Sequence, residues 1–258
     1  MSENLNRRDL LFAAAALVAI ARPSAARTYS GTVPWTAGLA DSPQASWEGE
    51  LRFFTSAEAA FIDAAVARLI PADHLGAGAK EAGVTTFLDR QLAGSYGRAE
   101  RWYMRGPWHD GTKSQGYQSR LSPAQLYRVA IEAVDERCRQ TFSGKVFAEL
   151  SHDQQDSVLT DIEKGKLKIE EIGPHTVAIE GAKGPHSDTF FAVLMQNTIE
   201  GFFSDPIYGG NRDMVGWKLI GFPGARYDYR PYVGRHGEKL DLEPVGIRGR
   251  PAWNEKQS

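Results

Sequence analysis

The chain has 258 residues, of which 42% are hydrophobic and 24% charged, a composition typical of a globular protein with one or two domains. A formal net charge of −2 gives no domain-wide basic field, which argues against a nucleic-acid-binding protein. The single cysteine, Cys138, excludes an internal disulfide and cannot by itself hold an iron–sulfur cluster or a c-type haem.

The first 26 residues have the features of an export signal. The adjacent Arg7 and Arg8 precede an apolar run over residues 10–21, and small residues follow up to Ala26. This run is too short for a stable transmembrane helix, which needs about 20 apolar residues. The arginine pair indicates the twin-arginine route, the alternative being a chance pair in an ordinary secretory signal. We expect residues 1–26 to be a twin-arginine signal peptide and the mature protein to be periplasmic.

Two segments without helical or strand periodicity flank the centre of the chain. Residues 27–52 are rich in Gly, Pro, Ser and Thr and contain Trp35 and Trp47, so we expect an extended arm. Residues 230–258 also lack a period, and we expect an extended C-terminal tail.

Between these segments, residues 53–229 carry the pattern of a helical domain. Apolar residues recur at helical spacing, and four starts have a hydroxyl at the cap position: Thr55, Ser122, Ser151 and Ser187. The spacing predicts helices over residues 56–70, 84–93, 123–142, 152–164 and 188–203. The last is apolar around most of its circumference and is expected at the centre of the bundle. Residues 165–184 are polar, with a short hairpin as an alternative to a loop. The fold class is therefore mainly α: an irregular helical bundle with long aromatic-rich loops and extended N- and C-terminal arms.

The stretch from Ser204 to Gly224 differs from the helices before it. Pro206 ends the preceding helix, and the glycines and asparagine that follow accept positive φ, so a tight fold of the backbone is expected. Aromatic rings among glycines suit a surface against which another molecule packs. Capping of the protein's own core is the alternative. The candidate contact residues of this stretch are Tyr208, Gly209, Gly210, Asn211, Trp217 and Phe222.

A second aromatic stretch, residues 96–118, has the same two interpretations. It contributes Trp102 and Trp108 as candidate anchors for a partner, because Trp buries much area for few torsions. A structured connection that packs on its own helices is the alternative.

The sequence carries no local motif for catalysis. It has no dinucleotide-binding glycine fingerprint after a strand, no haem-attachment motif, no paired Cys or His at zinc spacing and no Gly-x-Ser-x-Gly elbow. Its six histidines are scattered. We therefore predict no catalytic, cofactor-binding or metal-binding residue in this chain.

The run Tyr208-Gly209-Gly210-Asn211 and the run from Gly216 to Gly224 carry a resemblance to a known family. Together with the twin-arginine leader and the helical body, they make the chain similar to gluconate 2-dehydrogenase subunit 3, the small or gamma subunit of membrane-associated FAD-dependent sugar and polyol dehydrogenase complexes. The likeness extends over about residues 53–229.

The resemblance implies a non-catalytic subunit without a cofactor of its own. In that family the partner is an FAD-dependent catalytic subunit of the glucose–methanol–choline type, which oxidises a sugar, polyol or aldonic acid. A multihaem cytochrome c subunit often passes the electrons on to quinone. The small subunit binds and stabilises the flavoprotein and supplies its export signal, and it is associated with the inner membrane only through the complex. The alternative is a stand-alone periplasmic carbohydrate-binding protein or enzyme, with Trp102, Trp108 and Trp217 as a sugar-stacking platform.

Overall fold

The computed structural model describes residues 50–106, 112, 115–117, 119–167, 169, 187–225, 229–238 and 242–247. All of them belong to one compact unit, residues 38–258. Several predicted features lie outside the described residues: the signal peptide with Arg7 and Arg8, the arm up to residue 49, Trp108 and most of the polar segment that could form a hairpin.

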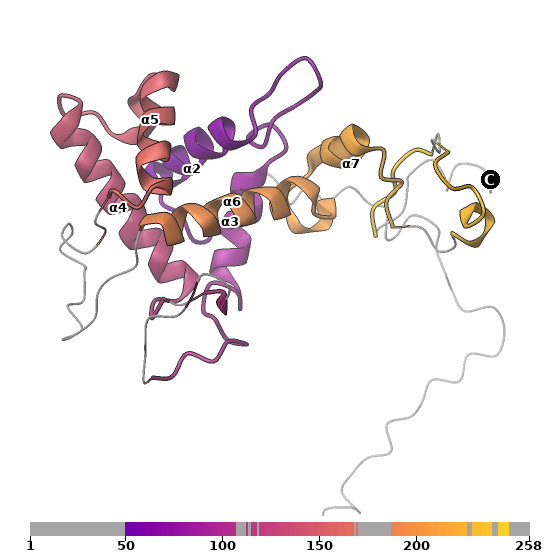
Figure 1. Ribbon diagram of the computed structural model, residues 1–258, viewed down its shortest axis with the longest axis horizontal. Coiled ribbons are helices and arrows are strands. Elements are labelled where there is room, and N and C mark those ends of the chain that lie inside the picture. Colours follow the sequence, from indigo (N-terminus) through magenta and orange to yellow (C-terminus); the bar gives the residue numbers. More distant parts are fainter. Residues whose placement is uncertain are drawn as a thin grey trace, which may run out of the picture. The chain divides into compact units, whose positions relative to one another are not determined.

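The described chain is mainly α-helical, which confirms the predicted fold class (Figure 1). In this part of the chain, isolated bridges are the only β-type pairing and no sheet forms. No helix of the described part is both long and apolar enough to cross a bilayer. The α-helices are α2 (Ser56–Leu69), α3 (Val84–Ala93), α4 (Pro123–Thr141), α5 (His152–Glu163), α6 (Ser187–Phe203) and α7 (Val215–Ile220). The 3₁₀ turns are η3 (Phe147–Glu149), η5 (Pro206–Tyr208), η6 (Arg212–Met214) and η7 (Arg230–Tyr232).

Local capping explains where three of the helices begin. Thr55, Ser122 and Ser151 are the N-caps of α2, α4 and α5, and each closes a capping box with a Glu or Gln three residues on. The predicted cap at Ser187 was wrong, because Ser187 is already the first residue of α6. Its buried hydroxyl donates a hydrogen bond to the carbonyl of Ile162 at 3.0 Å and so ties α6 to α5.

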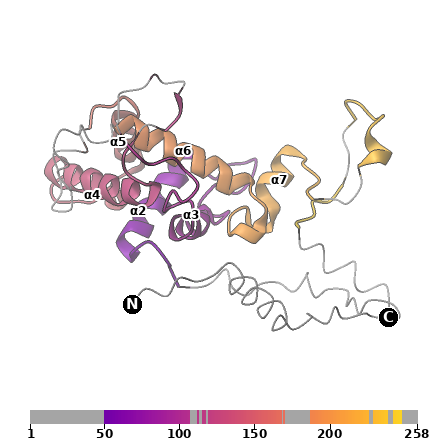
Figure 2. The same cartoon turned by 90° about the horizontal axis from the view of Figure 1, so that it is seen from below.

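Helix α6 organises the bundle. It contacts α2, α3, α4, α5 and α7, and in both views it runs from the bundle toward α7 (Figures 1 and 2). Its buried residues follow a helical stripe: Ser187, Phe190, Leu194, Asn197, Thr198, Gly201 and Phe202. The prediction of α6 as the central helix is therefore confirmed. Its remaining apolar residues, among them Ile199, lie outside the stripe, and Ile199 is 40% exposed.

Aromatic rings fill the core around α6. Tyr127 of α4 meets Phe190 of α6 edge to face, with ring centroids 5.4 Å apart. Phe61 of α2 packs on Phe147 with centroids at 4.7 Å. All four side chains are almost completely buried. Removal of one such ring typically costs about 3–5 kcal/mol, so these contacts supply a large share of the stability of the bundle.

A buried carboxylate fixes the chain where the arm enters the domain. Asp89 of α3 accepts hydrogen bonds from the backbone N–H groups of Arg52, Phe53 and Phe54, at 2.8, 2.9 and 2.9 Å. Arg128 of α4 donates to the carbonyl of Phe53, pairs with Glu58 and stacks over the Phe53 ring. These contacts anchor the end of the arm to two helices.

We predict that Asp89→Asn destabilises the domain. An amide offers one acceptor oxygen where the carboxylate uses two, so an N–H group of the segment from Arg52 to Phe54 loses its partner. Hydrogen bonds to a charged group contribute about 1.5–3 kcal/mol, and a loss of that size is expected in urea unfolding. The control Asp161→Asn removes an exposed carboxylate and should stay within about 0.5 kcal/mol of the wild type. Equal stabilities of the two variants would contradict this account.

Candidate partner-binding site

The chain that follows α6 folds tightly back on the end of that helix. Asp205 caps η5 by accepting the N–H of Ile207 at 2.9 Å, and Pro206 occupies the first position of the turn, where its missing N–H costs nothing. Gly209 then adopts φ = 104°, which a residue with a side chain rarely does. Helix α6 ends at Phe203, three residues before Pro206, which agrees with the prediction that Pro206 ends this helix, and the predicted tight turn at the glycines is confirmed.

Asn211 holds this turn together from the inside. Its side chain is completely buried, and its backbone has φ = 47°. The amide Nδ2 donates to the carbonyl of Ser204 at 2.8 Å, and Oδ1 accepts the N–H of Gly216 at 2.8 Å. One side chain therefore joins the end of α6 to the start of α7. An asparagine suits the position because it tolerates the left-handed region and offers both a donor and an acceptor.

Close backbone contacts explain two of the glycines. A β-carbon at Gly210 would overlap the carbonyl of Gly201, and one at Gly216 would overlap the carbonyl of Phe202. Both carbonyls belong to the last turn of α6. Glycine at positions 210 and 216 thus allows the turn and the start of α7 to pack directly on the end of α6.

Trp217 of α7 also packs against the end of α6. Its side chain is 5% exposed, and its indole N–H donates to the carbonyl of Phe203 at 2.8 Å. Phe222 meets it edge to face, with centroids 5.2 Å apart. The interpretation that rings of this stretch cap the protein's own core therefore applies to Trp217. A ring buried in this way offers no platform for stacking a sugar.

Other apolar residues of the stretch face solvent. Tyr208 is 50% exposed, Phe222 44% and Ile220 61%, and Leu219 is also exposed. Of the candidate contact residues, Tyr208 and Phe222 are therefore accessible to a partner in the free chain, whereas Gly209, Gly210, Asn211 and Trp217 are buried beneath them.

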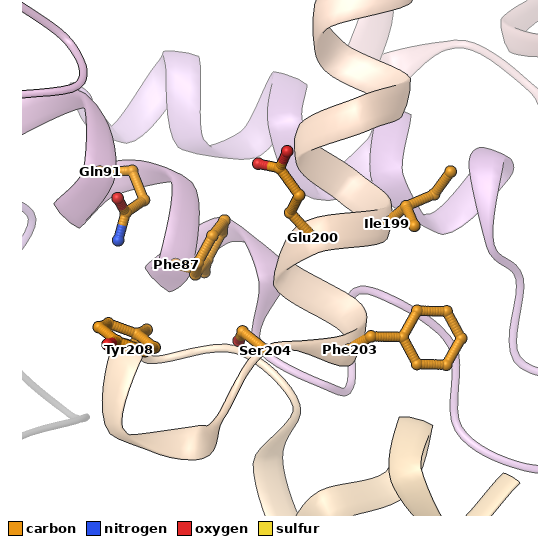
Figure 3. A pocket seen from close by; sticks show the side chains of 7 residues that line it. All are labelled: Phe87, Gln91, Ile199, Glu200, Phe203, Ser204 and Tyr208. Carbon is orange, nitrogen blue, oxygen red and sulfur yellow. The ribbon is translucent and has the colours of Figure 1, made fainter. Parts of the chain in front are cut away.

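Tyr208 also lines an open groove of about 430 Å³ between α3 and α6 (Figure 3). The lining is mostly apolar: Phe87 of α3, Ile199 and Phe203 of α6, and the Tyr208 ring. Gln91, Glu200 and Ser204 add polar groups. The sequence interpretation missed this groove because α3 and α6 are far apart in the chain. The available signal was the apolar character of α6 around most of its circumference, which leaves apolar residues such as Ile199 outside the buried stripe.

The second aromatic stretch forms a small cluster. Trp102 is 37% exposed and meets Tyr96 and Tyr117 with centroids at 5.7 and 5.1 Å. Tyr96 donates its hydroxyl to Asn197 of α6 at 2.9 Å, so the cluster is attached to the bundle. Trp102 is thus partly packed on its own chain and partly available.

The ionisable groups form no acid–base constellation in the part that the structure describes. Burial raises the pKa of the Cys138 thiol to about 12, so it remains a protonated, buried thiol. His74, His152 and His236 lie on the exposed surface. Among the described residues, no three His, Cys, Asp or Glu side chains are grouped as metal ligands. The surface features that stand out are the apolar groove and the exposed residues of α7.

A family model described as gluconate 2-dehydrogenase subunit 3 matches residues 56–224, more than half of the chain. The match begins with α2 and ends just after Phe222, so it includes the bundle and the stretch built on the end of α6. Curated proteins and solved structures gave no match.

We predict that Gly210→Ala destabilises the protein because the added methyl group overlaps the Gly201 carbonyl. Such overpacking costs about 1–3 kcal/mol, measurable as a lower free energy of unfolding in urea. The control is Gly234→Ala, at an exposed position where a β-carbon meets nothing within 4 Å. It should show no loss. An unchanged stability of Gly210→Ala would show that the turn is not packed on α6.

Proposed function

Because the chain belongs to the gluconate 2-dehydrogenase subunit 3 family, we propose that it is the non-catalytic small subunit of a periplasmic FAD-dependent dehydrogenase complex. Family membership makes it a subunit of a dehydrogenase complex. We further propose that it binds and stabilises a flavoprotein of the glucose–methanol–choline type that oxidises a sugar, polyol or aldonic acid. FAD is held by that partner, and a multihaem cytochrome c is its electron acceptor in complexes that contain one.

The main observation behind this proposal is that the residues matched by the family model include an exposed apolar surface. The matched residues end on the segment whose outer side exposes Tyr208, Leu219, Ile220 and Phe222. Exposed aromatic and aliphatic side chains on a rigid support are the usual anchors of a protein–protein interface. The buried hydrogen bonds of Asn211 fix that support, so little order has to be gained on binding.

We propose that the leader exports the partner as well as this chain. The paired Arg7 and Arg8 supply a twin-arginine signal, and that route carries folded proteins. A flavoprotein that folds around FAD in the cytoplasm would then cross the membrane bound to this subunit.

The partner is tested by isolation of the complex. A C-terminally tagged chain, purified from the periplasm of its own host, should elute with a second protein that mass spectrometry identifies as a flavoprotein. The eluate should show the absorption spectrum of bound flavin and reduce an artificial electron acceptor when a sugar, polyol or aldonate is added. Elution as a monomer that oxidises or binds a sugar by itself would contradict the proposal and support the stand-alone alternative.

The export role is tested by the double variant Arg7→Lys, Arg8→Lys. Lysine keeps the positive charge but not the arginine pair, so the twin-arginine route should fail while folding is unaffected. We expect both this chain and the flavoprotein to disappear from the periplasmic fraction and to accumulate in the cytoplasm, as measured by immunoblot and flavin content. A single change at the nearby Arg22 to Lys is the control. Normal periplasmic levels of the flavoprotein in the double variant would contradict the export role.

A further inference from the structure

The groove between α3 and α6 is an open, mostly apolar surface of the described chain. Phe87, Ile199, Phe203 and Tyr208 line it, and the side chains of Ile199 and Tyr208 are 40% and 50% exposed. Figure 3 shows the Tyr208 ring below Phe87, with Glu200 on the turn of α6 above Ser204. An apolar lining on an exposed helix face is expected where another surface packs.

Glu200 gives this groove a charge. Its carboxylate lies on the exposed side of α6 and accepts hydrogen bonds from the amides of Gln196 at 2.9 Å and Asn197 at 3.2 Å. No lysine or arginine of the described residues forms an ion pair with it. A carboxylate that a partner covers must gain a cation or lose much hydration energy. An occupant with a basic group opposite Glu200 would supply that cation.

A buried network sets the position of Glu200. The Asn197 oxygen accepts the hydroxyls of Tyr96 and Tyr127, at 2.9 and 3.0 Å, and its amide nitrogen donates to Glu200. Burial raises the pKa of Tyr127 well above its ordinary value, so its hydroxyl stays a donor. The carboxylate is thus held in place by groups of the core and is pre-organised for an ion pair.

A small molecule fits these features less well than a protein segment does. Pockets for small ligands bury most of the surface of the ligand. This groove is open, so a small molecule bound in it would keep much of its surface in contact with water.

We propose that this groove is the docking site for an apolar segment of the flavoprotein subunit that carries a lysine or arginine opposite Glu200. The inference rests on the proposed function and adds the site and the chemistry of the partner segment. Apolar side chains of that segment contact Phe87, Ile199, Phe203 and Tyr208, and its cation pairs with Glu200. Tyr208 contributes an aromatic anchor at the loop end of the groove.

The test uses the flavoprotein that co-purifies with the wild-type chain, released from the complex and titrated back onto each variant. Glu200→Lys places a cation opposite the partner's cation, and Ile199→Glu places a charge in the apolar contact. Each should raise Kd by at least about tenfold. Glu200→Gln should remove most of the salt dependence of Kd, because the ion pair is lost while the shape is kept.

The matched control is Glu163→Lys, the same reversal at an exposed position of α5 outside the groove, and it should bind as the wild type does. Circular dichroism and thermal unfolding check that every variant is folded. If Glu200→Lys is unstable, the loss of salt dependence in Glu200→Gln decides the question.

The outcomes separate this inference from the proposed function. If the wild-type chain binds the flavoprotein and the variants Glu200→Lys and Ile199→Glu bind it equally well, the docking site is overturned and the proposed function stands. If the free chain binds a sugar and no flavoprotein, and Ile199→Glu abolishes the sugar binding, the groove is a ligand site. The docking site and the proposed function are then both overturned.

Discussion

The structure depends on the close contact between the Gly209-Gly210-Asn211 turn and the last turn of α6. Two conditions make that contact: glycine at 210, where a β-carbon would overlap the Gly201 carbonyl, and the buried amide of Asn211, which joins Ser204 to Gly216. The chain after α6 is therefore a rigid extension of the central helix. Helix α6 in turn contacts every other α-helix of the described chain, so the position of the turn is fixed by the packing of the whole bundle.

This contact decides which aromatic rings are structural and which are available to a partner. With the turn seated, Trp217 points inward and donates to the carbonyl of Phe203, and the exposed rings Tyr208 and Phe222 flank it in sequence. The same seating brings Tyr208 against α3 and completes the groove with Phe87 and Ile199. Ile199 of α6 lies outside the buried stripe of that helix, so it adds exposed apolar surface to the same groove. A subunit that binds a flavoprotein can use such a surface without having to fold upon binding.

Local sequence was sufficient for most of the helices and insufficient for the site. The capping boxes at Thr55, Ser122 and Ser151 depend on residues three positions apart, so the sequence predicts them directly. Ser187 was assigned wrongly because its hydroxyl is used by Ile162 of another helix. The burial of Trp217 and the exposure of Tyr208 could not be distinguished, since both are aromatic residues near glycines and only contact with α6 separates them. The groove combines residues of α3 and α6 that lie more than a hundred positions apart. The hydrophobic periodicity of each helix does not predict which other helix packs beside it.

The most direct test of this account is hydrogen–deuterium exchange of the free chain, resolved to the amides between Ser204 and Gly224. The account predicts that the Gly216 amide, which is buried and bonded to Asn211, exchanges about as slowly as the amides in the core of α6. The exposed end of α7 should exchange faster. Exchange of the whole segment at the rate of an unfolded chain, with protection only after a flavoprotein is added, would contradict it, because the segment would then be ordered by the partner and not by α6.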